Sequence, residues 1–207
     1  MMRGHDAWSC DLLPSERAGQ HIQGDFREAL KQHWDFIGFH NDCRVMANSG
    51  VRWLYKAGQP VYAEVLGRTS RYHARIRNEA RWGELLAAAE MFNLSLDCRV
   101  PGYVENSVMH CHAKKLIRRE QDQTIQPWWF GVPRFKATCL WLRGIPPLEA
   151  TDKLIPPLKG TQSHKEWSAV HRASPGKNRW KERSRTFPGI ANAMAEQWGA
   201  QSDTKSP

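Results

Sequence analysis

Reactive side chains occur in five short segments of the chain. They supply a thiol, several carboxylates and an amide, which are groups used for nucleophilic attack and proton transfer. Each also has a plainer interpretation: Asp11 as the cap of a turn or helix, and Gly24-Asp25 as a turn. Likewise, Cys43 could be a buried cysteine at a strand end, and Glu105-Asn106 a surface turn. The five segments are residues 8–14, 22–25, 40–43, 105–106 and 183–190.

A second chemical feature is positive charge. The 207 residues include 30 Lys and Arg against 21 Asp and Glu, which gives a net charge of +9. Residues 164–185 alone carry seven Lys or Arg and two Glu. Such an excess favours a polyanionic partner, most often nucleic acid, although a solvated basic surface is the simpler alternative. The candidate phosphate contacts are Lys177, Arg179, Lys181, Arg183 and Arg185.

Cysteine usage argues against a disulfide framework and against a metal site. The five Cys are an odd number and form no CxxC pair. The run His110-Cys111-His112 resembles a metal ligand set, but on an extended strand adjacent side chains point to opposite faces. No apolar run approaches the ~20 residues needed to cross a bilayer, and the N-terminus has no apolar signal-type stretch. We therefore expect an intracellular protein with reduced thiols, no membrane contact and no metal.

Apolar patterning predicts an α/β fold in the first half of the chain. Residues 7–10 form a short predicted strand ending at Asp11, and residues 34–39 form a buried strand after a short helix at 26–32. Residues 81–94 form the best amphipathic helix, followed by a strand at 100–104. The alternation of strands and helices is typical of a parallel sheet. The expected apolar face of the long helix consists of Trp82, Leu85, Leu86, Ala89 and Phe92.

The second half has a different pattern. Residues 126–131 and 137–142 predict an antiparallel pair, and a proline-rich surface loop follows. Ile190, Met194 and Trp198 are spaced i, i+4, i+8, which predicts a last helix ending at Gly199. We expect one domain over residues 1–199, in which 124–186 is an irregular, basic, DNA-facing part. Residues 200–207 are expected to be a disordered tail.

In their order, the five segments resemble the small phage and prophage proteins described as cytosine-specific DNA methyltransferases. The resemblance covers roughly residues 4–199 and is closest at 136–142 (KATCLWL) and 183–199 (RSRTFPGIANAMAEQWG). It implies a mostly parallel, Rossmann-like methyltransferase sheet, S-adenosylmethionine as cofactor and DNA as partner. It also implies a location in the cytoplasm of a bacterial host. Residues 55–78, which hold Arg68, Arg71, Arg75 and Arg77, resemble the family least and are interpreted as an insertion.

The resemblance assigns a role to each segment. Asp11 would hold the ribose of the cofactor, and Gly24 and Asp25 would contact its adenine. Cys43 would attack carbon 6 of cytosine as a thiolate, which requires a lowered pKa near positive charge such as Arg44. Glu105 would protonate or hydrogen-bond nitrogen 3 of the base, and Asn106 would fix the loop by hydrogen bonds. Trp128, Trp129 and the basic residues 177–185 would replace the stacking and pairing of a base taken out of the duplex.

Two departures from the family weaken the expectation of catalysis. Asn41 and Asp42 stand where the family has two prolines, and the charge of Asp42 should raise the pKa of Cys43. The family also opens with a central strand and a glycine-containing turn for the cofactor, whereas this sequence starts just before its second strand. Either the natural start lies upstream, or tight cofactor binding is lost and a partner chain or second copy completes the sheet. The alternative function is a non-catalytic nucleic-acid- or protein-binding module, such as a phage regulator or an inhibitor of host defence.

Overall fold

A four-stranded, open, mixed sheet forms the centre of the protein in the computed structural model, which describes residues 5–65, 68–172 and 186–199. Its strand order is β3-β6-β8-β7, with β3 parallel to β6 and β8 antiparallel to both of its neighbours. The α/β class is therefore confirmed, with a mixed sheet. The strands are β3 (Ile37–His40), β6 (Gly102–Ser107), β7 (Gln123–Ile125) and β8 (Thr138–Arg143).

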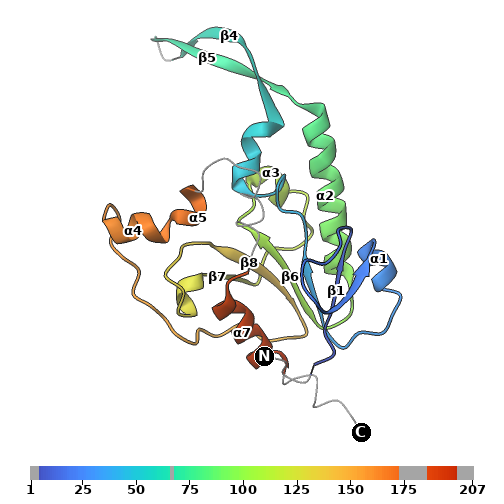
Figure 1. Cartoon of the computed structure of the whole chain (residues 1–207). Helices are drawn as coiled ribbons and strands as arrows, with labels where there is room; N and C mark the ends of the chain where they lie inside the picture. The colour runs from blue at the N-terminus through green and yellow to red at the C-terminus, as the bar shows by residue number, and fades with distance from the viewer. Residues whose placement is uncertain (1–4, 66–67, 173–185, 200–207) are drawn as a thin grey trace.

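A separate parallel pair lies beside the β3 edge of this sheet (Figure 1). It consists of β1 (Trp8–Asp11) and β2 (Gln20–Gln23), followed by the single helical turn α1 (Phe26–Ala29). Within the described residues, β1 pairs only with β2 and β3 pairs only with β6. Both strands therefore keep an unpaired edge, as expected from the sequence.

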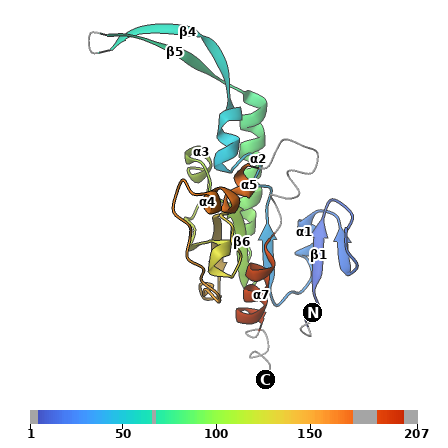
Figure 2. The same ribbon diagram turned by 60° about the vertical axis from the view of Figure 1, so that its left-hand side comes forward.

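Two helices cover opposite faces of the central sheet, as the two ribbon views show (Figures 1 and 2). Alternate side chains of β8 point to opposite faces. Trp141 packs edge-on against Phe92 of α2 (Glu79–Asp97), with ring centroids 4.8 Å apart. Leu140 belongs instead to the cluster that includes Ile190 and Met194 of α7 (Pro188–Gln197). The protein thus has three layers, and the site residues lie where β3 and β6 end between them.

Both long helices follow the apolar spacing seen in the sequence. Leu85, Ala89 and Phe92 of α2 are buried, but Leu86 is 50% exposed, so its predicted place on the buried face was wrong. The last helix starts at Pro188, whose missing N–H would be unpaired at a first helical position in any case. Its Ile190 and Met194 are buried, and Trp198 is buried just after its end.

The predicted antiparallel pair exists, but its first strand was misplaced. Residues 123–125 form β7, whereas Pro127–Trp129 form a 3-10 turn, η2. The partner strand β8 lies inside the main sheet rather than in a separate C-terminal part. The proline-rich connection is irregular as expected and leads to α4 (Gln162–Trp167) and α5 (Ala169–Arg172). The predicted tail, residues 200–207, lies outside the described residues.

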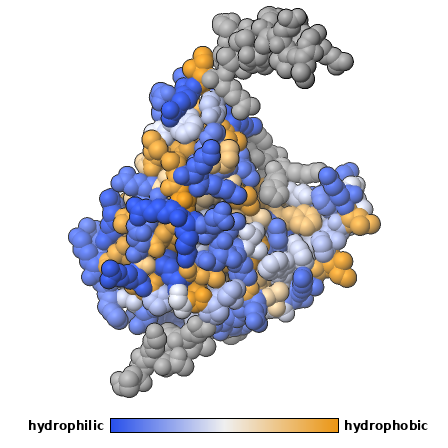
Figure 3. Space-filling model, turned by 180° about the vertical axis from the view of Figure 1, so that it is seen from behind, coloured by the Kyte–Doolittle hydropathy of each residue, from blue (hydrophilic) through white to orange (hydrophobic). Residues whose placement is uncertain are grey.

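The least expected feature is a long β-hairpin between the 3-10 helix η1 (Asn48–Leu54) and α2. It consists of β4 (Tyr55–Val65) and β5 (Arg68–Arg77), which pair antiparallel and project away from the body (Figure 1). This is the segment that the sequence singled out as an insertion. On the face seen from behind, apolar and polar residues are intermixed over the body of the protein (Figure 3).

Gly102 allows β6 to approach β3, and its replacement should be costly. Its φ is +145°, and a Cβ at this position would lie 1.9 Å from the Ile37 carbonyl oxygen. We expect Gly102→Ala to lower the free energy of unfolding by about 3 kcal/mol, because it adds a backbone clash to an unfavourable conformation. Gly83→Ala in α2 is the control, since nothing lies within 4 Å of its added Cβ and alanine favours helix.

The measurement is urea denaturation of both variants and the wild type. We expect Gly83→Ala to be at least as stable as the wild type, by up to about 1 kcal/mol. Equal stability of Gly102→Ala and the wild type would show that β3 and β6 do not approach each other in this way.

Candidate functional site

The carboxyl ends of β3 and β6 bring the main candidate residues together. His40 and Glu105 face each other in the parallel register of these strands, and Cys43 follows three residues after His40. Glu105 and Asn106 lie inside β6 rather than after a strand ending at residue 104, so the predicted strand bounds were two to three residues early. Parallel strands place functional groups at this end of a sheet.

Glu105 is held by a chain of hydrogen bonds that starts at Tyr103. Burial raises the pKa of the Tyr103 phenol, so its hydroxyl stays protonated. This hydroxyl lies 3.0 Å from His40 Nε2, and His40 Nδ1 lies 3.2 Å from Glu105 Oε2. The consistent assignment has Tyr103 donating to Nε2 and the Nδ1–H donating to the carboxylate. The Glu105 side chain is only 18% exposed, so His40 fixes its orientation within a largely closed environment.

Cys43 lies in the same site, but its surroundings disfavour the thiolate. Burial raises the pKa of its thiol, and the negative charges of Glu105 and Asp42 raise it further. A hydrogen bond with Ser107 and the charge of Lys136 act in the opposite direction without reversing the shift. Because the thiolate is the nucleophilic form, the geometry supplies the right groups in the wrong ionisation state.

The neighbouring arginine does not compensate. Arg44 donates to both carboxylate oxygens of Asp42, with Nη2 at 2.7 Å from Oδ2 and Nε at 3.0 Å from Oδ1. Burial opposes ionisation of Asp42, but the hydrogen bonds from Arg44 lower its pKa and keep it charged. The expected blunting effect of Asp42 on Cys43 is therefore present, and Arg44 is engaged by Asp42.

Removing the charge of Asp42 should make Cys43 more reactive. Asp42→Asn takes away one of the charges that raise the pKa of Cys43 and frees Arg44. At pH 8 the alkylation rate follows the thiolate fraction, so we expect iodoacetamide to modify Cys43 about threefold faster in the variant. The measurement is mass spectrometry of quenched time points, with Cys43→Ser identifying the modified peptide.

Cys111 is the internal reference for this experiment, because its side chain is exposed and lies outside the site. Its rate should be the same in both proteins. If Cys43 of the wild type reacts at pH 7 as fast as Cys111, the thiol is not suppressed and this interpretation of the site is wrong.

Asn106 does not make the hydrogen bonds expected of it. Its side chain is 1% exposed, and within the described part of the chain neither its amide nitrogen nor its oxygen has a hydrogen-bond partner. Burying an unpaired amide costs about 1–3 kcal/mol. The loop-fixing role of Asn106 therefore stays a prediction, since the described residues supply none of its hydrogen bonds.

The space next to Glu105 is nearly closed. The cavity between Glu105, Lys136 and the start of α7 has a volume of about 10 Å³, which is room for one water molecule at most. Trp128 and Trp129 do not line it, and they pack edge-on against each other with Lys153 near both rings. A flipped base cannot enter without movement of the surrounding side chains.

A much larger slot separates β1 from β3. Its volume is about 880 Å³, and its walls are β1, the start of α1, β3 and one side of α2. Asp11, Gly24 and Asp25 all line this slot, so the structure brings the three predicted cofactor residues together. Asn41 and Asp42 line the same slot, which therefore reaches the segment just before Cys43.

The carboxylates in the slot have local partners. Asp11 Oδ1 accepts a hydrogen bond from the Leu13 N–H at 2.9 Å, which is the turn cap considered from the sequence. Asp25 caps α1, accepts hydrogen bonds from Arg27 and forms an ion pair with it, and these interactions lower the pKa of Asp25 to about 2. In this arrangement both acidic side chains that the resemblance assigns to S-adenosylmethionine already serve as caps.

Other candidate residues contribute nothing to this site. Lys177, Arg179, Lys181, Arg183 and Arg185 lie outside the described residues. His110 precedes the short helix α3 (Cys111–Lys114) rather than lying on a strand, and its Nδ1 accepts from Ala113 N–H while its Nε2 bonds the Val45 carbonyl. Residues 5–65, 68–172 and 186–199 contain no group of three His, Cys, Asp or Glu side chains that could hold a metal, and none of their helices could cross a membrane.

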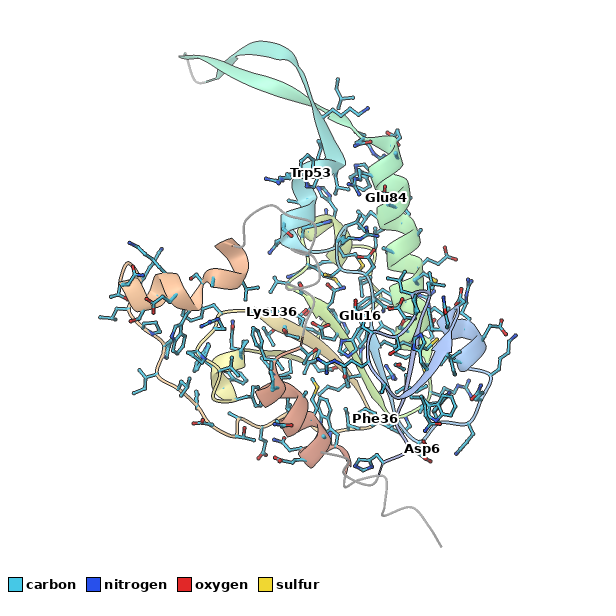
Figure 4. The ribbon with its side chains drawn as sticks, viewed as in Figure 1. Asp6, Glu16, Phe36, Trp53, Glu84 and Lys136 are labelled. Carbon is cyan, nitrogen blue, oxygen red and sulfur yellow. The ribbon has the colours of Figure 1, made fainter. Side chains whose placement is uncertain are left out.

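Sequence reasoning assigned no role to three residues that shape the site. His40 is the first residue of the segment 40–43, and Lys136 is the first residue of the segment 136–142. Tyr103 lies in the predicted strand 100–104. Their partnership depends on the register of β3 with β6, which pairs residues more than sixty positions apart. A histidine at a strand end, three residues before a candidate nucleophile, was the available signal. Lys136, labelled in Figure 4, interacts electrostatically with Cys43 and lines the small cavity next to Glu105.

Comparison with models of protein families, with curated proteins and with solved structures found no match. The function is therefore argued from the site itself.

Proposed function

We propose that this protein is a DNA-binding relative of the cytosine-5 DNA methyltransferases that does not transfer methyl groups as the 207-residue chain. The observation that carries the proposal is the meeting of Cys43 and Glu105 beside a slot that also holds Asp11 and Asp25. Cys43 and Glu105 lie beside the slot, and Asp11 and Asp25, from two further segments, line it. Their order along the chain is the one that suggested the family.

The strand arrangement supports this descent. A doubly wound sheet of order 3-2-1-4-5-6 would leave two parallel pairs, 3-2 and 4-5, if strand 1 were absent. The described strands form such pairs, β2-β1 and β3-β6, and the slot lies between them. The antiparallel strand β8 extends the second pair. We interpret the slot as the position of a central strand of the family.

The site chemistry argues for binding rather than catalysis. A free thiol has a pKa of about 8.5, so less than about a tenth of it is ionised at pH 7.5, and Cys43 has a higher pKa than that. The cavity beside Glu105 does not admit a base, and Asp11 and Asp25 act as caps. The net charge of +9 favours electrostatic binding to the phosphate backbone of DNA, which needs no catalytic group.

A second candidate function is protein binding through the slot. β1 and β3 each present an unpaired edge within the described residues, and such edges are templates for an added strand. Trp8 and Trp34 pack edge-on beside the slot, with Trp8 45% exposed. A strand from a partner protein or a second copy would cover this surface and complete the sheet.

Two titrations of the purified chain test the proposal. Duplex DNA should bind at low salt without any cofactor, and S-adenosylmethionine should not bind tightly. DNA binding that requires the cofactor, or incorporation of labelled methyl groups into DNA, would contradict the proposal. Failure to bind DNA, together with binding of a strand from a partner protein or a second copy at the slot, would favour the second candidate function.

A further inference from the structure

The β4–β5 hairpin is attached to the body only at its base. β4 begins directly after η1. β5 ends at Arg77, and only Asn78 separates it from the start of α2. Its two strands have 11 and 10 residues and project as a free ribbon in both ribbon views (Figures 1 and 2). A two-stranded ribbon alone is only marginally stable in water, so a structure of this length suggests an external partner.

The sequence of the ribbon is strongly basic on one strand. Residues 55–77 include five Lys or Arg and one acidic residue, Glu64. Arg71, Arg75 and Arg77 occupy alternate positions of β5, and alternate positions of a strand share one face. In the register of the hairpin they stand opposite Tyr62, Ala57 and Tyr55. One face of the ribbon thus combines arginine with tyrosine positions.

At the base of the hairpin, arginine side chains again lie beside aromatic rings. The Arg77 guanidinium lies 4.2 Å from the centre of the Trp82 ring, and its ion pair with Glu79 is long at 3.7 Å and exposed. Arg52 lies 4.5 Å from the centre of the Trp53 ring. Trp53 is 54% exposed beside the start of β4 (Figure 4). Trp82 is half-buried against the core, whereas the Arg52–Trp53 pair is exposed, and an exposed arginine–aromatic pair can contact phosphates and stack on bases.

We propose that the β4–β5 hairpin is a DNA-binding arm that places its arginine face against duplex DNA. The major groove of B-DNA is wide enough for a two-stranded ribbon, and arginine pairs with phosphates and with the guanine edge in that groove. The Arg52–Trp53 base would contact the backbone beside the groove. The inference rests on the proposed DNA binding and assigns a part of it to the hairpin.

The test compares two variants that each lose three positive charges, one from the hairpin and one from the body of the protein. Arg71→Gln/Arg75→Gln/Arg77→Gln removes three positive charges from the ribbon. Arg17→Gln/Lys31→Gln/Lys159→Gln removes three from exposed positions of the body. Binding of a fluorescein-labelled duplex is measured by anisotropy between 50 and 200 mM NaCl. The ribbon variant should bind at least about tenfold more weakly at 100 mM, with a salt slope shallower by about 2–3, because each phosphate contact contributes about 0.9.

The body variant should change the affinity by less than threefold. Arg71→Lys/Arg75→Lys/Arg77→Lys keeps the charge and should recover most of the affinity and the salt slope. Circular dichroism checks that every variant is folded. If the wild type binds no DNA at 50 mM NaCl, the proposed function fails together with this inference. If the wild type binds but the ribbon variant matches it, or changes only the oligomeric state, the inference alone is overturned.

Discussion

Raising the NaCl concentration from 50 to 200 mM should weaken duplex DNA binding by several hundredfold. The net charge is +9, and residues 177–185 contain five of the basic side chains in nine positions. If about five phosphates are neutralised, the slope of log affinity against log salt is about −4.5, which corresponds to roughly 500-fold over a fourfold change in salt. Anisotropy of a labelled duplex at four salt concentrations measures this slope.

The variant Lys177→Gln/Arg179→Gln/Lys181→Gln/Arg183→Gln separates this basic segment from the hairpin. Its slope should be shallower by about 1.8, because two of the five contacts are left for this segment once three belong to the hairpin, and each contributes about 0.9. Binding should depend little on sequence, since phosphate contacts carry no base information. Absence of binding to both duplex and single-stranded DNA at 50 mM salt would rule out the nucleic-acid interpretation.

Local pattern predicted the elements that carry the fold. The apolar spacing of Leu85, Ala89 and Phe92 and of Ile190, Met194 and Trp198 correctly predicted both helices that cover the sheet. These positions repeat along one helix face, so burial can be inferred without knowledge of the partner. The strands β1, β3, β6 and β8 were also located to within three residues, whereas residues 126–131 were misassigned because an aromatic run at a proline resembles a strand.

The site depended on information that is not local. Glu105 meets His40 only because β3 and β6 pair in a particular register, and the antiparallel pairing of β6 with β8 brings Lys136 to the same end of the sheet. The polar partners of Asp11 and Asp25, by contrast, lie within two residues and matched the plainer capping interpretation. The hairpin escaped prediction because pairing of two long polar strands leaves little apolar periodicity.

Tight binding of S-adenosylmethionine should be absent from the 207-residue chain. The slot between β1 and β3 is open, and the two acids that line it serve as caps, Asp11 for a turn and Asp25 for α1. Freeing the two carboxylates for a ligand would remove both caps, and each cap contributes about 1 kcal/mol to stability. Each hydrogen bond to a charged ligand that cannot form costs about 1.5–3 kcal/mol, so the loss of one at each acid lowers the affinity by roughly a hundredfold to ten-thousandfold. We therefore expect a dissociation constant in the millimolar range or weaker.

Isothermal titration calorimetry of the purified chain with S-adenosylmethionine tests the proposed function most directly. The proposal predicts no measurable saturation up to about 1 mM cofactor, in a preparation that still binds duplex DNA at 50 mM salt. Saturable binding in the micromolar range, weakened by Asp11→Ala, would contradict it. That result would mean that the slot forms a working cofactor site and that the chain is an enzyme.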